Sequence, residues 1–379
     1  MQRICHMTSG HNSNDTRIFY KECVSLSKAG YEVYLIATGE SREEAGVQIV
    51  GIGKRPDGRV KRMTQTAKKI YEKALTLHAD IYHFHDPELL PYGVKLAKKG
   101  YKVIWDSHEE YTSMLDNKSY IPKPIRKTVA EAFRKYYFSI LHYFVAVIVA
   151  SPNDGDKLKK HNKRIVTVTN YPIVTDEEKA DISSTVSFPE DDSKEKAIVF
   201  AGGVGEQWRH KEIITALEYC PNVKYVLCGN SIEGYLDELK QLPAWGQVDY
   251  RGKVPFTEVN NILKRCSVGM SVIKYSGNTD WKTGRLANTK LYEEMQAGLP
   301  VICTDLILWK ETIDKYQCGI CVNPLDPKEI AKAINYLIEN PEKAREMGQS
   351  GKQAVFFEYN WATQEKTLLK LYQYITNDK

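Results

Sequence analysis

Lysine and glutamate stand three residues apart at the start of a predicted helix, in the segment 288–302, which reads Asn-Thr-Lys-Leu-Tyr-Glu-Glu-Met-Gln-Ala-Gly-Leu-Pro-Val-Ile. Asn288 or Thr289 is expected to cap this helix, so Lys290 lies in its first turn, where a cation opposes the helix dipole by up to ~1 kcal/mol. An anion nearby would explain that placement. Glu293 shares a face with Lys290, so the pair suits phosphate and sugar hydroxyls. A surface ion pair is the alternative interpretation.

A glycine-rich turn offers a second site for an anion. After the strand-like run 197–201 come Gly202, Gly203 and Gly205. Residues without Cβ let the backbone approach a phosphate closely, and the helix that follows supplies free N–H groups. Arg209 could add a bidentate contact to the same phosphate. A plain tight turn is the alternative, because glycine-rich turns between strands and helices are common.

Polar side chains follow three strand-like runs in the first half of the chain, within 9–17, at 85–86 and at 106–110. The carboxyl ends of parallel strands meet at one edge of a sheet, so these groups are expected to converge on a polyhydroxylated or phosphorylated ligand. The residues expected to bind it are His11, Asp15, Arg17, His85, Asp86, His108 and Glu109. For Asp15, a role restricted to capping the next helix is the alternative.

Strand-like and helix-like runs alternate along the chain, which predicts an α/β fold with parallel sheets. In the first half, strands are expected at 3–7, 32–37, 81–84, 102–105, 143–150 and 165–169, with helices such as 17–29 and 88–98 between them. In the second half, strands are expected at 197–201, 224–228, 248–250, 268–273 and 301–304, with helices at 211–219, 234–241, 257–265 and 290–296. Beyond Pro327 we expect only helices.

The length of 379 residues indicates two domains, at ~100–200 residues each. We expect a first domain at 1–172, a linker rich in Asp, Glu, Ser and Lys at 173–196, a second domain at 197–358, and a final helix at 359–379 that packs on the first domain. Open parallel sheets bind ligands beyond the carboxyl ends of their strands. Two such domains facing one another would form a cleft with a ligand on each wall.

The segment 290–302 resembles the Glu-Ala-Met-Ala-x-Gly-x-Pro-Val-Ile signature of the retaining glycosyltransferases of family 4, with Glu293 on the signature glutamate. The resemblance covers nearly the whole chain and is strongest at 11–31, 80–110 and 286–304. It implies the GT-B fold, with two Rossmann-like domains facing across a cleft and a C-terminal helix that crosses back to the first domain. It also implies transfer of a hexose or N-acetylhexosamine, with retention, from a nucleotide-diphosphate sugar to a glycan or lipid-linked acceptor in cell-surface polysaccharide synthesis. No metal or other cofactor is expected.

The resemblance also implies roles for single residues. Arg209 and Lys290 would bind the pyrophosphate, Glu293 the ribose, and His108 would lie between donor sugar and acceptor. The segment 251–255 is similar to the turn whose backbone meets the base. The residues expected to bind the donor are Gly202, Gly203, Arg209, Gly229, Lys253, Val254, Asn288, Thr289, Lys290 and Glu293. The residues expected to be catalytic are His108, Arg209, Lys290 and Glu293.

One position departs from the family pattern, because the first glutamate of the common Glu-x7-Glu motif is replaced by Arg285. The branch with an Asn-x-Lys-x-x-Glu start to this helix often lacks that acid, and this chain fits that branch. Arg285, Asn288 or Asn278 could supply the contacts to the donor sugar. A sugar-nucleotide epimerase of GT-B architecture and a catalytically silent nucleotide-sugar-binding protein remain alternatives. A NAD-dependent dehydrogenase is disfavoured, since no strand–GxGxxG–helix pattern with an acidic residue ~20 positions later occurs.

Basic residues concentrate in one part of the chain. The formal net charge is +5, and residues 118–164 hold eleven Lys and Arg against three Asp and Glu, so the remainder is net acidic. A basic, aromatic-bearing helix within 118–138 could lie on an anionic membrane surface, or it could pack on its own domain with a solvated basic face. Nucleic acid is not an expected partner, because no binding motif accompanies the charge.

The remaining signals concern location and metals. The chain lacks an apolar run of about eighteen residues and a signal-peptide layout, so a cytoplasmic protein is expected, with possible peripheral contact at the inner face of the plasma membrane. Cys318 and Cys321 have C-x-x-C spacing without a second pair, which favours packing over zinc binding. His83 and His85 share one face of a strand and could form a ligand pair, although burial in the strand favours packing, and no metal is expected.

Overall fold

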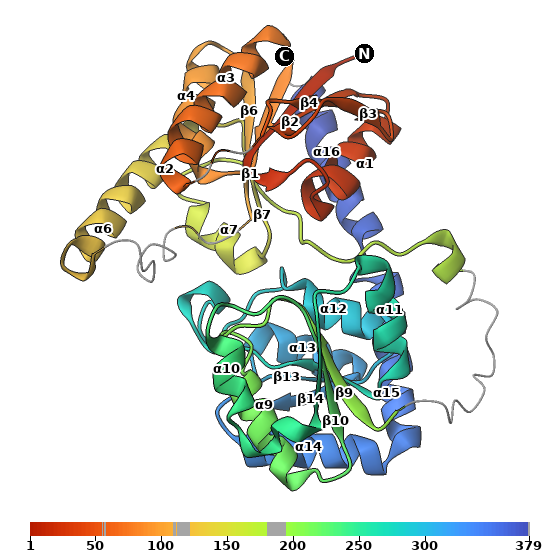
Figure 1. The fold of residues 1–379 in the computed structure, drawn as a ribbon. Coiled ribbons are helices and arrows are strands. Elements are labelled where there is room, and N and C mark those ends of the chain that lie inside the picture. The colour runs from red at the N-terminus through yellow and green to blue at the C-terminus, as the bar shows by residue number, and fades with distance from the viewer. Residues whose placement is uncertain (55, 57, 109–110, 112–121, 180–194, 378–379) are drawn as a thin grey trace. The chain divides into compact units, whose positions relative to one another are not determined.

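The computed structural model describes residues 1–54, 56, 58–108, 111, 122–179 and 195–377 (Figure 1). The chain forms two compact units, one of Met1–Asn170 with Trp361–Lys379 and one of Tyr171–Asn360. Each unit is built around its own sheet and is described by itself below. The expected linker at 173–196 falls inside the range of the second unit, and its residues 180–194 lie outside the described part of the chain.

The first unit contains a sheet in the order β3-β4-β2-β1-β5-β6-β7-β8. Its strands are parallel except for the pairing of β3 with β4. The strands are β1 (Arg3–Asn12), β2 (Glu32–Thr38), β3 (Arg42–Glu44), β4 (Val47–Gly51), β5 (Ile81–Phe84), β6 (Lys102–Ser107), β7 (Ala146–Val149) and β8 (Ile165–Thr167). Sequence analysis missed β3 and β4, because β3 is a short, polar edge strand without an apolar run. The strand expected at 143–150 is shorter, since Leu141–Tyr143 forms a helical turn before it.

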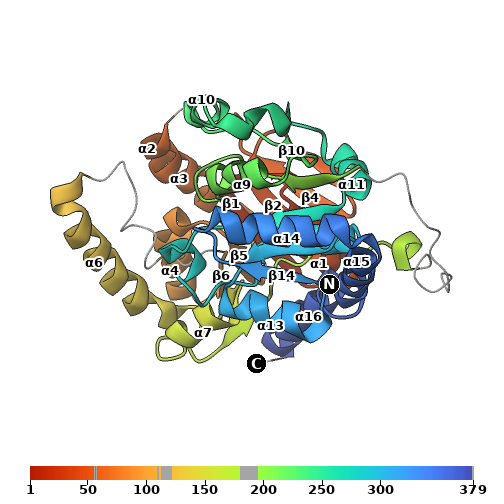
Figure 2. The ribbon, with the colours of Figure 1, turned by 90° about the horizontal axis from the view of Figure 1, so that it is seen from below.

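Helices cover both faces of this sheet (Figures 1 and 2). They are a π-helical segment (Thr16–Cys23) that continues as α1 (Val24–Lys28), then α2 (Arg59–Lys61), α3 (Ala67–Thr76), α4 (Leu90–Lys98), α6 (Lys123–Ile140), α7 (Pro152–Leu158) and α16 (Trp361–Asn377). Side chains of a strand alternate between faces. In β1, Ile4 packs into the core shared with α16, whereas Cys5 and Met7 pack into the core beneath α3 and α4.

The last helix of the chain completes the first unit. Leu368 and Tyr372 of α16 are fully buried against the sheet, and the Trp361 indole N–H donates to Ser25 Oγ at 3.0 Å. Figure 1 shows α16 in blue beside α1. This packing confirms the expected return of the C-terminal helix to the first domain.

The second unit contains a sheet in the order β11-β10-β9-β12-β13-β14, and all its paired strands are parallel. The strands are β9 (Ala197–Ala201), β10 (Lys224–Cys228), β11 (Val248–Gly252), β12 (Val268–Ser271), β13 (Val301–Thr304) and β14 (Gly319–Val322). Ile198 and Phe200 of β9 face one core, and Val199 faces the other. Both units therefore have the Rossmann-like architecture that the GT-B expectation required.

The helices of the second unit follow its strands in the expected alternation. They are α9 (His210–Ala216), α10 (Tyr235–Lys240), α11 (Phe256–Arg265), α12 (Thr289–Gln296), α13 (Ile307–Tyr316), α14 (Pro327–Glu339) and α15 (Pro341–Phe357). Beyond Pro327 the described elements are helices, as predicted. Among the described residues, no helix combines the length and the apolar character that crossing a bilayer would require.

Candidate active site

The turns after β9 and β10 meet in the second unit with no room for a side chain. Gly229 has φ +138°, and a Cβ atom there would lie 1.6 Å from the Gly202 carbonyl oxygen. Gly202 N–H donates to Cys228 O at 2.9 Å, and Gly229 N–H donates to Gly252 O at 2.6 Å. The glycines predicted to approach a phosphate thus form one rigid backbone rim at the carboxyl edge of the sheet.

Lys290 lies beside this rim. A Cβ atom at Gly202 would lie 3.2 Å from Lys290 Cε, so the lysine stem passes along the glycine-rich turn. Asn288 Oδ1 accepts from Lys290 N–H at 3.2 Å, and Asn288 is therefore the N-cap of α12. The structure brings together the two elements that sequence analysis predicted, separately, to bind an anion.

Lys290 and Glu293 form an ion pair, with 2.7 Å between Nζ and Oε2. Both side chains are about one-quarter exposed, at 27% and 24%. The contact shows that Lys290 and Glu293 lie on one face of the helix, as predicted. The alternative interpretation, a surface ion pair, predicts the same contact. A ligand phosphate could bind here in two ways. It could displace Glu293 from the Lys290 ammonium, or it could accept from the ammonium N–H groups that Glu293 leaves over while it also contacts the glycine rim.

Arg209 directly precedes α9 and pairs with Glu212 at 2.9 Å. Its Nε is buried and has no hydrogen-bond partner among the described residues. No described contact joins Arg209 to Lys290. Lys253 and Val254 follow β11, with Lys253 exposed and Val254 packed against a core cluster.

Arg285 is held on a neighbouring turn, where its guanidinium donates to the carbonyl oxygens of Asn278 at 2.9 Å and Gly277 at 3.4 Å. The position of the family's missing glutamate is therefore occupied by a cation that organises the 277–279 turn. Asn278, which was named as a possible sugar contact, lies in that turn. The contacts to the donor sugar remain a prediction.

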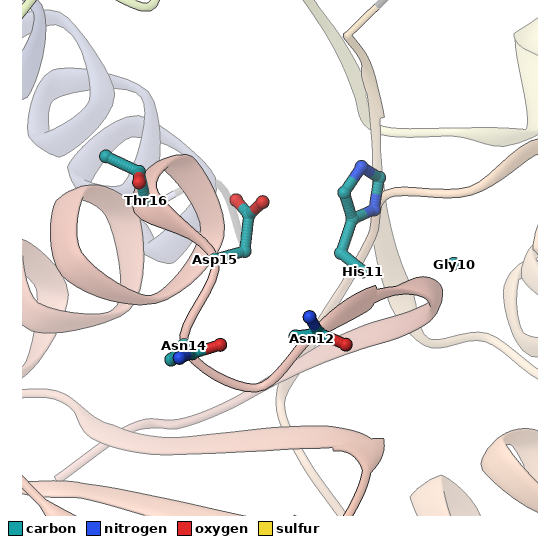
Figure 3. A pocket seen from close by; sticks show the side chains of 6 residues that line it. All are labelled: Gly10, His11, Asn12, Asn14, Asp15 and Thr16. Atoms are coloured by element: carbon teal, nitrogen blue, oxygen red, sulfur yellow. The ribbon is translucent and has the colours of Figure 1, made fainter. Parts of the chain in front are cut away.

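A pocket of about 360 Å³ opens after β1 in the first unit (Figure 3). It is lined by Gly10, His11, Asn12, Asn14, Asp15 and Thr16. Asp15 Oδ1 accepts from the N–H groups of Arg17 and Ile18, each at 2.9 Å, so the expected capping role is present. In Figure 3 the side chains of His11 and Asp15 project to the same side of the loop, where a polar ligand could reach both.

Asp86 holds this loop from beneath and is almost fully buried. Its Oδ2 accepts from Thr8 Oγ1 at 2.7 Å, Ser9 N–H at 2.7 Å and Gly10 N–H at 2.9 Å, and its Oδ1 lies 3.1 Å from His11 Nδ1. Burial alone would raise the pKa of Asp86, but these hydrogen bonds, the one from His11 first, lower it. Asp86 thus orients His11 instead of offering a free carboxylate to the ligand.

Arg17 is buried, which differs from its expected contact with the ligand. The guanidinium binds Asp106 through two bonds, Nε to Oδ2 at 3.1 Å and the second N–H group to Oδ1 at 3.0 Å, and it also donates to Val168 O at 2.8 Å. Glu22 lies 3.0 Å from Arg17 Nε. Arg17 therefore supports the site from the interior, because its donors are committed to buried acceptors.

His108 is the part of this cluster that reaches the surface, with 12% of its side chain exposed. Its Nε2 lies 3.1 Å from Asp106 Oδ2 and 3.0 Å from His85 Nδ1. His85 itself is fully buried and cannot contact a ligand directly. Glu109, the last expected ligand of this set, lies outside the described residues.

Two groups of side chains could hold a metal ion in the described part of the chain. They are His6, Glu22, His83 and His85, and His85, Asp106 and His108, with the ligand atoms of each group within 4.8 Å of one another. In the second group the Arg17 guanidinium already occupies both oxygens of Asp106, and a dication beside that cation would be repelled. Metal-independent chemistry remains our expectation.

The buried ionisable groups of the first unit have shifted pKa values. Burial lowers the pKa of His85 to about 4, and burial also lowers the pKa values of His6 and His83 well below the ordinary 6.5. Burial and the neighbouring Asp106 raise the pKa of Glu22. The three histidines are therefore neutral at neutral pH, and the surroundings of Glu22 favour its protonated form.

These shifts predict that stability falls on mild acidification. Each neutral histidine contributes stability that is complete above pH 6.5 and is lost as the pH falls below that value, down to about 4 for His85, because the unfolded chain binds protons that the folded chain does not. Glu22 acts with the opposite sign above pH 4.5. In the second unit burial lowers the pKa of His210 and raises that of Glu294, so these two groups act with opposite signs.

The check is thermal unfolding at about pH 7 and about pH 5 at constant ionic strength. For each proton that the unfolded chain binds in excess of the folded chain, the free energy of unfolding should fall by ~1.4 kcal/mol per pH unit. A melting temperature that is unchanged or higher at the lower pH would contradict the neutral state of the buried histidines. Carboxylates with lowered pKa values, such as Asp86, lose their contribution only below this range.

Comparison with known proteins agrees with this architecture. A family model described as Glycosyltransferase Family 4 matches residues 17–171, and one described as Glycosyl transferases group 1 matches residues 185–354. Together the two matches cover most of both units. The chain is a family 4-like glycosyltransferase with the GT-B fold.

Solved structures similar to this glycosyltransferase support the fold. Sucrose-phosphate synthase from Thermosynechococcus elongatus has a TM-score of 0.75 and 16% identity, with all of both chains covered. HepE of Anabaena, solved with UDP and glucose, has a TM-score of 0.70 and 12% identity, with 98% of this chain and 100% of that one covered. Spore coat protein SA of Bacillus subtilis is 25% identical over 189 residues, which are 47% of this chain and 48% of that protein. The glycosyltransferase therefore matches about half the length of that curated relative.

Proposed function

We propose that this glycosyltransferase moves a hexose or N-acetylhexosamine from a nucleotide-diphosphate sugar to a glycan or lipid-linked acceptor, with retention of anomeric configuration, in cell-surface polysaccharide synthesis. The observation that carries the proposal is the placement of Lys290 against the Gly202 turn. An ammonium and exposed backbone beside a helix N-terminus suit a diphosphate. The solved complexes of HepE with UDP, and with UDP and glucose, support a nucleotide-sugar donor.

In the proposed reaction the donor binds the second unit and the acceptor binds the first. Lys290 and Arg209 neutralise the leaving diphosphate, which takes up the acceptor proton as the new glycosidic bond forms on the same face of the sugar. Glu293 holds the ribose hydroxyls, and His108 lies where donor sugar and acceptor meet. Fixed positive groups stabilise the charge that develops on the leaving group, so no metal is required.

The test is a thermal-shift panel of nucleoside diphosphates and their sugars. A ligand present at 100 times its dissociation constant adds ~2.7 kcal/mol to the stability of the folded state. We expect a shift with one base and none with the others. A panel without any shift would contradict the donor site around Lys290.

Product analysis then separates the proposal from its alternatives. A sugar-nucleotide epimerase would convert the donor to a free isomer without an acceptor, and a catalytically silent binding protein would neither transfer nor hydrolyse it. Spore coat protein SA matches half of the chain, and this relationship is consistent with a role in a cell-surface structure. Transfer with retention is checked by the anomeric configuration of the product.

The helix α6 supports a second part of the proposal, peripheral contact with an anionic membrane. Ile125, Val129, Ala132 and Tyr136 are exposed and follow one another at i, i+4, i+7 and i+11, so they form one apolar stripe. Exposed lysines lie on the same helix, and Tyr137 on another face packs into the core. In Figures 1 and 2 α6 extends away from the sheet of its unit. The expected segment 118–138 begins outside the described residues, at 118–121.

We predict that replacing Ile125 and Val129 with serine weakens binding to phosphatidylglycerol vesicles at least about tenfold, because ~1.4 kcal/mol of lost apolar burial corresponds to that factor. Cosedimentation measures it, and Ile307→Ser, an exposed isoleucine of the second unit, is the control. Wild-type protein that fails to bind, or that binds neutral and anionic vesicles equally and without salt dependence, would contradict the membrane contact.

A further inference from the structure

A chain of hydrogen-bonded rings runs from His108 into the core of the first unit. His108 Nε2 lies 3.0 Å from His85 Nδ1, and His85 Nε2 lies 2.9 Å from His6 Nδ1. His6 Nε2 lies 3.3 Å from the Tyr372 hydroxyl, which lies 2.8 Å from His83 Nδ1. Apart from His108, every member is fully buried. The chain joins three strands of the sheet to the last helix of the sequence.

Neutral rings in such a chain can hold their protons in only two arrangements. A neutral imidazole has one N–H donor and one bare nitrogen, and His85 and His6 each use both nitrogens in the chain. Each contact therefore needs one donor and one acceptor, and the choice at one contact fixes the choice at the next. Burial keeps these rings neutral, since it lowers the pKa values of both.

The carboxylate of Asp106 favours one of these arrangements. It lies 3.1 Å from His108 Nε2 and is ionised, because Arg17 and His108 lower its pKa against the effect of burial. The same oxygen also lies 3.4 Å from His85 Nδ1, which is the longer of its two histidine contacts. A bare nitrogen is repelled more strongly at the shorter distance, so His108 Nε2 carries the hydrogen. His85 and His6 then carry theirs on Nε2, and Tyr372 accepts from His6 and donates to His83. In this arrangement His108 Nδ1 is bare and can accept a hydrogen bond or a proton.

We propose that Tyr372 is a positioning residue, whose hydroxyl holds the buried histidines in the tautomers that leave His108 Nδ1 bare. The inference rests on the proposed place of His108 between donor sugar and acceptor. Without the hydroxyl, His6 Nε2–H loses the one hydrogen-bond partner that the described residues give it in a site closed to water, and the ring gains by moving its hydrogen to Nδ1. The ring hydrogens of His85 and His108 then also move from Nε2 to Nδ1, and His108 Nδ1 becomes a donor.

The fully buried position of Tyr372 explains why a phenol stands there. Its ring packs with Leu368 and Ile375 in the apolar core between sheet and helix, where phenylalanine would fill the same space. The hydroxyl is the part that the packing does not require. It also makes the C-terminal helix part of the acceptor side, although α16 is more than 250 residues from His108 in sequence.

The experiment compares the full-length protein with Tyr372→Phe and a matched control, Tyr31→Phe. Tyr31 has its ring 5.9 Å from that of Tyr372 and is not part of the chain. Ring nitrogens of ¹⁵N-histidine are observed by long-range ¹H–¹⁵N correlation spectra at neutral pH, in which a bare and a protonated nitrogen are clearly separated. His6, His85 and His108 are assigned from single replacements by glutamine.

In wild type and in Tyr31→Phe we expect His6 and His85 to carry hydrogen on Nε2, with Nδ1 bare. In Tyr372→Phe we expect the assignment to reverse at both residues and to change at His108. Wild-type spectra with hydrogen on Nδ1 of His6 would overturn the inference without any variant. Spectra of Tyr372→Phe in which His85 and His108 are unchanged would overturn it as well.

Activity separates this inference from the proposed function. Tyr372→Phe should lower kcat about tenfold or more, with KM for the donor unchanged, because His108 Nδ1 would then donate a hydrogen bond where it should accept one from the acceptor hydroxyl that it positions. If His108→Ala transfers sugar at the wild-type rate, the proposed place of His108 in the reaction is wrong, whatever the spectra show. If the spectra do not change in Tyr372→Phe, the positioning role is wrong, whatever the activity shows.

Discussion

Replacing Lys290 with alanine is expected to slow sugar transfer on the order of 100-fold or more, because the leaving diphosphate then develops its charge without the ammonium that neutralises it. The measurement is release of nucleoside diphosphate in the presence of acceptor, with the donor that the thermal-shift panel identifies. The fall should be seen in kcat and in kcat/KM, since the interaction strengthens as the bond to the sugar breaks.

A matched control for Lys290 exists on α15. Lys343 and Glu346 form an ion pair with the same i, i+3 spacing and nearly the same length, 2.9 Å against 2.7 Å, on an exposed surface. Lys343→Ala should leave transfer unchanged. If Lys290→Ala keeps turnover within a few-fold of wild type, the pair with Glu293 is only a surface ion pair, and the proposed donor site is wrong.

Replacing Arg17 with methionine is expected to destabilise the protein by about 3–5 kcal/mol, the cost of removing one partner from a buried ion pair. The Asp106 carboxylate would lose both guanidinium bonds in a site closed to water, and its pKa would rise as a result. Chemical denaturation monitored by circular dichroism measures the loss. His108 would also lose the fixed carboxylate that orients it.

The control for Arg17 is Arg42, which pairs with Glu44 on an edge strand with both side chains 38% exposed. Arg42→Met should change the free energy of unfolding by less than about 1 kcal/mol, as is typical of surface pairs. Equal losses for the two arginines would show that Arg17 is not the centre of a buried cluster. A loss below about 1 kcal/mol for Arg17→Met would have the same meaning.

The local patterns in the sequence predicted most of the scaffold, because strand-like apolar runs and helix starts depend on neighbouring residues. The strands at Ile81–Phe84, Ala197–Ala201, Lys224–Cys228 and Val301–Thr304 have the predicted bounds. A cap at Asn288 or Thr289 was also predicted, because a capping side chain acts on N–H groups two residues away, and the structure has Asn288 as the cap. Strands β3, β4 and β14 were missed, and two of them, β3 and β14, are short strands at sheet edges, where patterns are weak or mixed.

The sequence could also indicate which residues gather at the carboxyl edges of the two sheets, because strand order and direction follow from the alternation of elements. It could not show which of the gathered residues reach the surface. Arg17, His85 and Asp86 have the same types and spacing as true ligand contacts, and the structure buries all three. Their burial depends on side chains from distant strands that fill the space above them.

What the sequence determined by itself is therefore the class of fold, the glycine-rich turn and the helix that follows Asn288. What only the tertiary structure determined is the approach of Lys290 to Gly202, the clamp of Arg17 on Asp106, and the junction of Tyr372 with His6 and His83. The reason is range. Capping and periodicity act over a few residues, whereas these contacts join residues between 88 and 366 positions apart and exist only when the strands and helices of each unit have packed.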